Sequence, residues 1–321
     1  MKTSEIILSA AAGAAALAGG WYATGKSFVD AALNREQPLL ATRISALVNG
    51  GKKPDDLSRK AEDAARRTKI LPMERVELTA WDGVHLVGHW YGCHDPKRVV
   101  IGMHGWRSAW YRDFAGILPF WHEHGCAVLL TEQRAHGESG GDTICFGAKE
   151  RFDCLDWAEY AAERTGGVLP IWLAGVSMGA TTVLLASGLA RVSPAVRGVM
   201  ADCGFISADA IWAHVAKDNF HLPYALFKPL TDRLCIRKTG CGPAEASTTA
   251  ALKRTRLPVL LVHGEADSFV PPSMSVKNYK SCAGPKRLLL VPGARHGMSY
   301  LVDTSSYESA VMDFWSAYET K

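Results

Sequence analysis

The chain has 321 residues, of which 48% are hydrophobic and 21% are charged, and its net charge is +4. This is an ordinary composition for a globular protein with a sizeable core, arranged as one large α/β domain or two small ones. The lysines and arginines are scattered and form no dense basic stripe, which argues against a nucleic-acid-binding function.

The eight cysteines lack the paired short spacing of a zinc site. Cysteine usage of this kind favours a reducing environment. Cys235 and Cys241 flank a short polar loop, so they could form a disulfide if the compartment were oxidising. Nothing in the sequence requires a metal or an organic cofactor.

The N-terminus contains an uncharged segment, residues 6–23, that is rich in Ala and Gly. Its length is near the minimum for a membrane-spanning helix. Three interpretations remain open: an uncleaved signal anchor, a cleaved signal peptide, and an Ala-rich soluble helix. Trp21 and Tyr22 favour the interfacial end of an anchor. We therefore expect residues 1–25 to anchor the protein in the cell membrane, with secretion or a cytoplasmic location as alternatives.

The next segment, residues 26–73, is charged and predicts a helical connector, with a helix over residues 55–67. The pattern then changes to strands. Residues 75–80 and 84–91 alternate apolar and polar side chains on either side of a turn, which predicts a hairpin.

Apolar runs recur along the rest of the chain, with loops and helical patterns between them. Runs of Val, Leu and Ile without strict alternation are typical of strands that are covered on both faces. Strands that alternate with helices predict a mostly parallel sheet. The predicted strands span residues 98–103, 127–131, 169–174, 196–201, 258–263 and 287–291, and the clearest helices span residues 148–164 and 307–318.

No strand is predicted between about residues 205 and 256. An insertion of this length is usually a lid, an active-site cover or a dimer surface. Its aromatic side chains suggest an apolar acyl pocket, although such residues more often pack a lid onto the core. The aromatic residues are Trp212, Phe220, Tyr224 and Phe227.

The segment 171–180 contains an apolar run, the pattern Gly-x-Ser-x-Gly and a helix-forming stretch. This order predicts a strand that turns sharply into a helix, with Ser177 at the strained turn. Gly175 and Gly179 fit because residues two before and two after the serine must be small. Such a turn exposes the hydroxyl to a base on one side and to substrate on the other, so Ser177 is the predicted nucleophile.

The loop after the predicted strand 98–103 is expected to supply part of an oxyanion hole. Its Gly105 lets the backbone fold tightly, so that the amide of Trp106 can point toward the serine. The amide of Met178, directly after the nucleophile, is the second expected donor. An ordinary tight turn is the alternative interpretation of this loop.

Two further strand ends supply an acid and a base. Asp267 lies just beyond the strand 258–263, where its carboxylate could orient an imidazole. Glu265 is a weaker candidate for that role, and a helix N-cap is the structural alternative for Asp267. His296 follows the last predicted strand and lies downstream of both partners, so we predict that it is the base.

Ser177, Asp267 and His296 occur in the chain order nucleophile, acid, histidine, and this set resembles the α/β-hydrolase superfamily over about residues 74–320. The resemblance implies an α/β-hydrolase fold: a mostly parallel central sheet flanked by helices. It places the catalytic domain at residues 74–321, with a helical lid insertion at about 205–256.

The segment 132–141 looks like the loop after the fourth strand of this superfamily, in which we interpret Arg134 and His136 as structural. Together with residues 104–108 and 201–204, it is similar to a bacterial branch of membrane-anchored hydrolases related to the prolyl-oligopeptidase-like group.

The predicted function is a serine hydrolase that cleaves small-molecule carboxylic esters through an acyl-enzyme intermediate, without a cofactor. A serine peptidase or amidase of prolyl-oligopeptidase-like type is the first alternative, and a thioesterase or acyltransferase is the second. A non-catalytic binding protein on the same scaffold is a further alternative, against which the complete triad argues.

Overall fold

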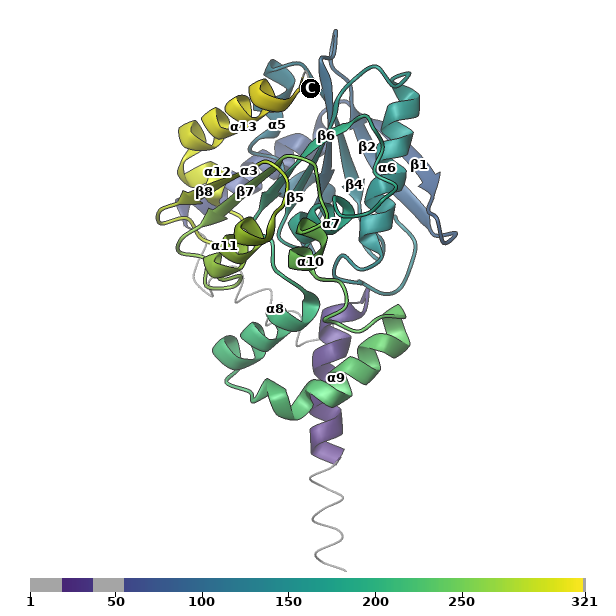
Figure 1. The fold of residues 1–321 in the computed structure, drawn as a ribbon, viewed down its shortest axis with the longest axis vertical. Coiled ribbons are helices and arrows are strands. Elements are labelled where there is room, and N and C mark those ends of the chain that lie inside the picture. Colours follow the sequence, from purple (N-terminus) through teal and green to yellow (C-terminus); the bar gives the residue numbers. More distant parts are fainter. Residues whose placement is uncertain (1–18, 37–54, 320–321) are drawn as a thin grey trace, which may run out of the picture.

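The computed structural model describes residues 19–36 and 55–319, in which eight strands form one sheet (Figure 1). The strand order is β1-β2-β4-β3-β5-β6-β7-β8. β2 is antiparallel to β1 and β4, and every other pairing is parallel. The strands are β1 (Glu74–Thr79), β2 (His85–Tyr91), β3 (Arg98–Met103), β4 (Cys126–Glu132), β5 (Ile171–Val176), β6 (Val196–Asp202), β7 (Val259–Gly264) and β8 (Lys286–Val291). The prediction of a mostly parallel sheet is confirmed.

Helices cover both faces of this sheet (Figure 1). One face carries α6 (Glu150–Arg164), α7 (Met178–Ala186), α10 (Thr248–Leu252) and α11 (Pro272–Ser281). The other face carries α4 (Trp110–Asp113), α5 (Leu118–Glu123) and α13 (Thr304–Tyr318), with α3 (Asp56–Ile70) packed against α4 and α12 (Ser299–Val302) beside α13.

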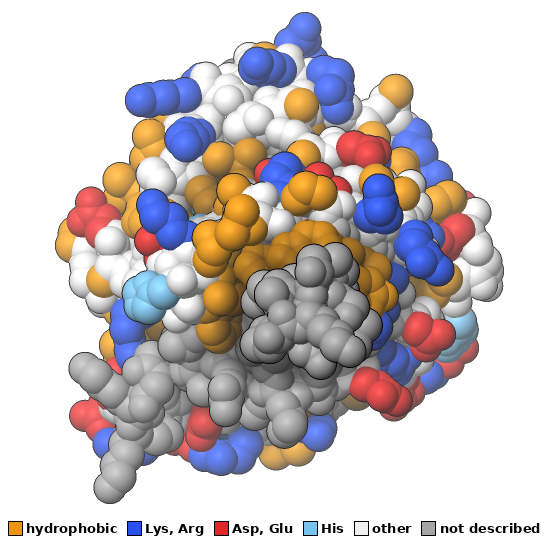
Figure 2. Space-filling view, turned by 90° about the horizontal axis from the view of Figure 1, so that it is seen from below, with side chains coloured by type: hydrophobic (Ala, Val, Ile, Leu, Met, Phe, Trp, Pro, Cys, Tyr) orange, Lys and Arg blue, Asp and Glu red, His pale blue; other side chains and the backbone are white. Residues whose placement is uncertain are grey.

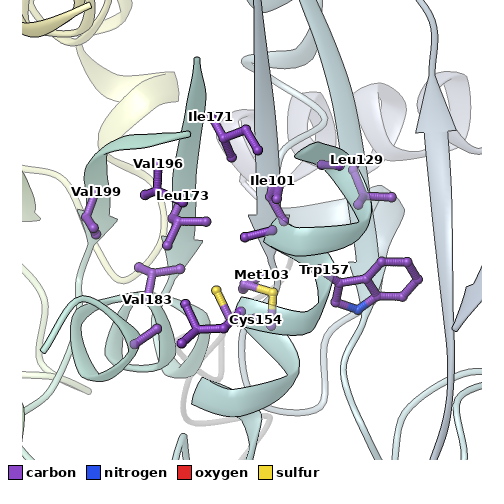
Figure 3. Packing of buried hydrophobic residues seen from close by; sticks show 14 of the residues in the cluster. Ile101, Met103, Leu129, Cys154, Trp157, Ile171, Leu173, Val183, Val196 and Val199 are labelled. Carbon is purple, nitrogen blue, oxygen red and sulfur yellow. The ribbon is translucent and has the colours of Figure 1, made fainter. Parts of the chain in front are cut away.

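Alternate residues of one strand pack into opposite halves of the core, because side chains along a strand point to alternate faces. Ile101 and Met103 of β3 contact the α6 and α7 side, where Figure 3 shows them near Trp157. Val100 between them packs on the α5 and α13 side. Burial on both faces explains why the strands are continuous apolar runs in the sequence.

The segment between β6 and β7 is helical, as predicted. It contains α8 (Ala208–His214), a π-helical turn (Val215–Asn219), α9 (Tyr224–Thr239) and α10. α8 and α9 lie beside an N-terminal helix over residues 19–33 (Figure 1). Phe28 of that helix packs edge-on against Trp212 with ring centroids 6.1 Å apart, and Trp21 stacks on Phe227.

The N-terminal helix runs without a break through residue 25, where the sequence predicted a boundary between anchor and connector. Within residues 19–36 and 55–319, no helix is long and apolar enough to cross a membrane. Residues 6–18 of the predicted span lie outside the described residues. Figure 2 shows hydrophobic side chains gathered on the end of the molecule to which this helix and α9 belong, and Trp21, Tyr22 and Leu226 are exposed there.

All eight cysteines are free thiols. The Cys235 thiol donates a hydrogen bond to the Cys241 carbonyl at 3.5 Å, so the pair that the sequence left open is not a disulfide in this structure.

Candidate active site

Ser177 lies at the turn between β5 and α7, in the strained conformation φ 56°, ψ −115°. β5 continues to Val176, beyond the predicted end at residue 174, so the strand leads directly into the turn. A Cβ on Gly175 would lie 2.2 Å from the Gly179 carbonyl oxygen, and one on Gly179 would lie 1.7 Å from the Met103 oxygen. The two glycines are therefore required by backbone packing around the serine.

This packing makes a direct prediction. The substitution Gly179→Ala is expected to lower the free energy of unfolding by about 3 kcal/mol or more, because the Met103 carbonyl belongs to β3 and cannot move aside. Urea denaturation measures the change. Gly92 has no atom within 4 Å of its would-be Cβ, so Gly92→Ala is the matched control and should leave stability nearly unchanged. Equal stability of the two variants would contradict this account.

Three predicted residues converge at the carboxyl edge of the sheet. The His296 Nε2 atom lies 2.9 Å from the Ser177 Oγ atom, and the His296 Nδ1 atom lies 2.7 Å from the Asp267 Oδ2 atom. Ser177 follows β5, Asp267 follows β7 and His296 follows β8, so parallel strands bring them to one edge. Glu265, the weaker candidate for the acid, is exposed to solvent.

The Asp267 carboxylate is fixed by the turn in which it lies. Its Oδ1 atom accepts the backbone N–H groups of Phe269 and Val270 at 2.9 and 2.8 Å, which leaves Oδ2 for the histidine. The alternative interpretation of Asp267 as an N-cap is wrong, because α11 begins at Pro272 and its N-cap is Pro271.

His263 is a further member of this site that the sequence analysis did not single out. Its Nε2 atom lies 2.8 Å from the Val270 carbonyl and 3.2 Å from Asp267 Oδ2. Both partners are acceptors, so Nε2 carries the proton and Nδ1 accepts from the Ser275 hydroxyl at 2.6 Å. His263 thus donates to the same carboxylate oxygen as His296. Its place at the buried end of β7 was the available sequence signal.

The electrostatics of the pair favour a charged carboxylate beside a basic imidazole. Burial alone disfavours ionised Asp267, but the His296 charge and the hydrogen bonds from both histidines hold the pKa of Asp267 well below its usual range. Burial also opposes protonation of His296, yet the charge and hydrogen bond of Asp267 raise the pKa of His296 above its ordinary value. The arrangement suits a histidine that must accept a proton from a neighbouring hydroxyl.

The predicted oxyanion donors lie beside Ser177. A Cβ on Gly105 would lie 3.3 Å from the Ser177 Cβ atom, so the 104–108 loop is in contact with the serine. Met178 is the first residue of α7, and its N–H has no carbonyl one turn earlier within the helix. The backbone N–H of Trp106, among the described residues, has no acceptor of its own. Both amides are therefore free of other acceptors near the serine, and their role as oxyanion donors stays a prediction.

His136 supports this loop from the neighbouring one, in which Arg134 is held by two carboxylates. Arg134 forms ion pairs with Asp153 and Asp82. The His136 Nε2 atom accepts the backbone N–H of Arg107 at 3.0 Å, and burial lowers the pKa of His136 to about 3, which keeps it a neutral acceptor. These contacts agree with the structural role expected for both residues.

The described residues include one group whose ligand atoms could surround a metal ion: Cys203, Asp267 and His296, within 4.8 Å of one another. Burial and the nearby Asp202 and Asp267 carboxylates raise the pKa of the Cys203 thiol well above its ordinary value. A neutral thiol is a poor metal ligand, and the other two residues are already bonded to each other. The geometry therefore suits proton transfer at Ser177 better than metal binding.

A cavity of about 410 Å³ contains Ser177 in its lining. It is also lined by residues of α3, α4, α5 and α12. Its lining includes the buried apolar side chains of Ile117, Trp121 and Val311 and the buried carboxylate of Asp202. All of residues 205–256 are described, and none lines this cavity. The prediction that the aromatic residues of the insertion form a pocket at the serine is therefore wrong. They pack on the apolar face of the N-terminal helix instead.

The cavity is closed on one side by α3, which the sequence analysis treated as a connector without a catalytic signal. Four residues of α3 line it: Ser58, Ala61, Glu62 and Ala65. Their spacing places them on one stripe of the helix. Three of the four side chains are small, so α3 covers the cavity without filling it.

No protein-family model matches the chain. The sequence is 28% identical over 271 residues to the uncharacterized protein YqkD of Bacillus subtilis (strain 168), covering 82% of this chain and 87% of that protein. The structure is similar to the Pyrococcus furiosus esterase Pf2001, with a TM-score of 0.62, 22% identity, and coverage of 84% of this chain and 95% of that one. It is also similar to the α/β hydrolase GrgF from Penicillium sp. sh18, with a TM-score of 0.61, 17% identity, and coverage of 78% and 100%.

These similarities, together with the strand order, show that the chain has the α/β-hydrolase fold. The finer resemblance to the membrane-anchored, prolyl-oligopeptidase-like branch stays a prediction.

Proposed function

We propose that the protein is a serine hydrolase that cleaves carboxylic esters. The observation that carries the proposal is the chain of hydrogen bonds from Asp267 through His296 to Ser177, with distances of 2.7 and 2.9 Å. Hydroxyl, base and orienting acid are within the reach that nucleophilic catalysis requires. Similarity to an esterase supports an ester substrate over other acyl compounds.

In the proposed mechanism, the Ser177 Oγ atom forms a bond to the ester carbonyl carbon while His296 Nε2 takes the hydroxyl proton. The carbonyl oxygen becomes an oxyanion that the amides of Trp106 and Met178 bind. His296 then gives the proton to the leaving alcohol as the ester C–O bond breaks. A water, deprotonated by His296, attacks the acyl-enzyme and releases the acid, which restores the Ser177 hydroxyl.

The experiment that tests the ester assignment is a substrate panel on the purified full chain. It compares p-nitrophenyl esters of increasing acyl length with aminoacyl anilides and acyl thioesters at equal concentrations. We expect the highest kcat/KM with esters. Higher kcat/KM with anilides would favour the peptidase or amidase alternative, and higher kcat/KM with thioesters would favour a thioesterase. Binding without turnover of any compound would favour a non-catalytic scaffold.

The cavity beneath α3 is the proposed site for the acyl group, because it contains the nucleophile and its lining includes several buried apolar side chains. The substitution Ala61→Phe is expected to lower kcat/KM for octanoate esters by about tenfold or more and to leave acetate esters nearly unaffected, because the added ring takes up cavity volume. Ala64 lies on α3 but does not line the cavity, so Ala64→Phe is the matched control. The same chain-length profile in both variants would contradict this placement.

A further inference from the structure

The 104–108 loop is bound to the end of the N-terminal helix, far away in the sequence. The last four carbonyls of a helix have no partner within it. Here all four accept hydrogen bonds: Asp30 from the Asn34 N–H, Ala31 from the Arg107 guanidinium, Ala32 from the Trp106 indole N–H, and Leu33 from the Ile144 N–H. Two of the four donors belong to adjacent residues of the predicted oxyanion loop.

Arg107 is the stronger of these two links. Its guanidinium donates to the carbonyls of Ala31 at 3.0 Å and Arg35 at 3.1 Å, and also to that of Asn34. Every hydrogen-bond acceptor of this guanidinium among the described residues is a carbonyl. Its positive charge therefore faces the negative end of the helix dipole, while burial lowers the pKa of Arg107 to about 10.

The backbone of Arg107 is fixed as well. Its φ of 53° lies in the left-handed region, which a side chain adopts only when its surroundings impose it. Its N–H is bonded to His136 Nε2, as described above. Arg107 is thus bound through its main chain to the domain and through its side chain to the helix.

The direction of the neighbouring Trp106 N–H is set by the peptide that joins Gly105 to Trp106. The Gly105 carbonyl accepts from His104 Nδ1 at 2.8 Å and from the Ser108 N–H at 3.2 Å. Because the peptide bond is trans, the Trp106 N–H points opposite to that carbonyl. In the preceding peptide, the Gly105 N–H donates to Asp113 Oδ2 at 2.6 Å. The next residue along the loop is Arg107, which is bonded to the helix end. Through Arg107, the helix end therefore helps to hold the Gly105–Trp106 peptide in this orientation.

We propose that Arg107 is a positioning residue for the oxyanion hole, and that the C-terminal end of the N-terminal helix is the anchor through which it acts. This inference rests on the proposed function. It implies that the backbone carbonyls of Ala31, Asn34 and Arg35, outside the predicted catalytic domain, are required for the rate of acyl transfer and not only for stability.

The test compares Arg107→Ala, Arg107→Lys and wild type as full-length proteins on one p-nitrophenyl ester, with active sites counted by fluorophosphonate labelling. Arg107→Ala is expected to lower kcat per labelled site by about 10- to 100-fold with little change in KM. It should weaken a trifluoromethyl ketone, which forms a tetrahedral oxyanion on the serine, by the same factor. Arg107→Lys should recover part of the loss, because an ammonium can still donate to the helix carbonyls.

Arg35→Ala is the matched control. The Arg35 side chain binds the same N-terminal segment to the carbonyls of Gly137, Ser139 and Gly141 and makes no hydrogen bond to the 104–108 loop. Alanine keeps the Arg35 backbone carbonyl that accepts from Arg107, so the kcat of this variant should match wild type. If Arg107→Ala fails to fold, Trp106→Phe keeps an aromatic ring beside Arg107 but removes the indole bond to Ala32, and it should lower kcat in the same direction. Wild-type kcat per site in these loop variants, an equal loss in Arg35→Ala, or an unchanged ketone affinity would overturn the proposal. Failure of the wild type to label or to hydrolyse the ester would instead contradict the proposed function.

Discussion

Replacing Ser177 by alanine is expected to abolish ester hydrolysis while the protein stays folded. The substitution removes the hydroxyl that lies 2.9 Å from His296 Nε2. Loss of the nucleophile in a working triad costs roughly 10⁶-fold in kcat, about as much as loss of the whole triad. The fold should survive because alanine at φ 56° has the same backbone strain as serine and adds no atoms to the turn.

The measurement is the initial rate with p-nitrophenyl butyrate together with the thermal unfolding midpoint. Ser187→Ala is the matched control: Ser187 is a buried serine at the other end of α7, and its hydroxyl donates only to the Leu184 carbonyl. This variant should retain wild-type kcat. A Ser177→Ala protein that is folded and keeps a rate within tenfold of wild type would show that another group is the nucleophile.

The substitution Asp267→Asn is expected to have the second largest effect, a loss in kcat of roughly 10⁴-fold. An amide can present an N–H to His296 Nδ1, which favours the tautomer that carries its proton on Nε2. In that tautomer the histidine cannot accept the Ser177 proton. His263, which donates to the same Asp267 oxygen, would meet an amide in place of a carboxylate.

The pH profile gives this prediction a second readout. The pKa of His296 is raised by Asp267, and only neutral His296 can act as the base. In the wild type, kcat/KM should therefore fall as the pH drops through a value above that of an ordinary histidine. Without the carboxylate charge the pKa of His296 falls, so the acidic limb of Asp267→Asn should move to lower pH. A limb that stays in place, or moves to higher pH, would contradict the role assigned to Asp267.

The sequence was sufficient for the parts of the site that lie in local patterns. A nucleophile at a strand–helix turn needs small neighbours, and this requirement pointed to Gly175 and Gly179 in the sequence. In the structure a Cβ at either position would collide with the backbone, so the same requirement holds. Asp267 and His296 could be found because parallel strands end at one edge, so the search reduced to a few loops. The continuous apolar runs predicted the strands from β3 to β8 because both faces of the sheet are covered there, and the alternating pattern predicted β1 and β2.

The parts that could not be predicted depend on contacts between distant segments. In the sequence, the stripe of small residues on α3 cannot be told from one side of an ordinary charged helix. Its role as a wall of the cavity follows only from the packing of α3 beside α4. The aromatic residues of the insertion are compatible in sequence with either an acyl pocket or simple packing, and the sequence does not show that Phe28 of the N-terminal helix packs against them. Arg107 has no local pattern at all, since its acceptors lie some 70 residues earlier in the chain.

Covalent labelling of the full chain with a fluorophosphonate, followed by mass spectrometry of the peptides, tests the central claim most directly. Such a probe reacts only with a serine that a base activates and whose adduct an oxyanion hole accepts. We predict one phosphonate adduct, on Ser177 in the peptide that spans β5 and α7, and its absence in His296→Ala. An adduct on another residue, or an unlabelled Ser177 in folded wild-type protein, would contradict the account.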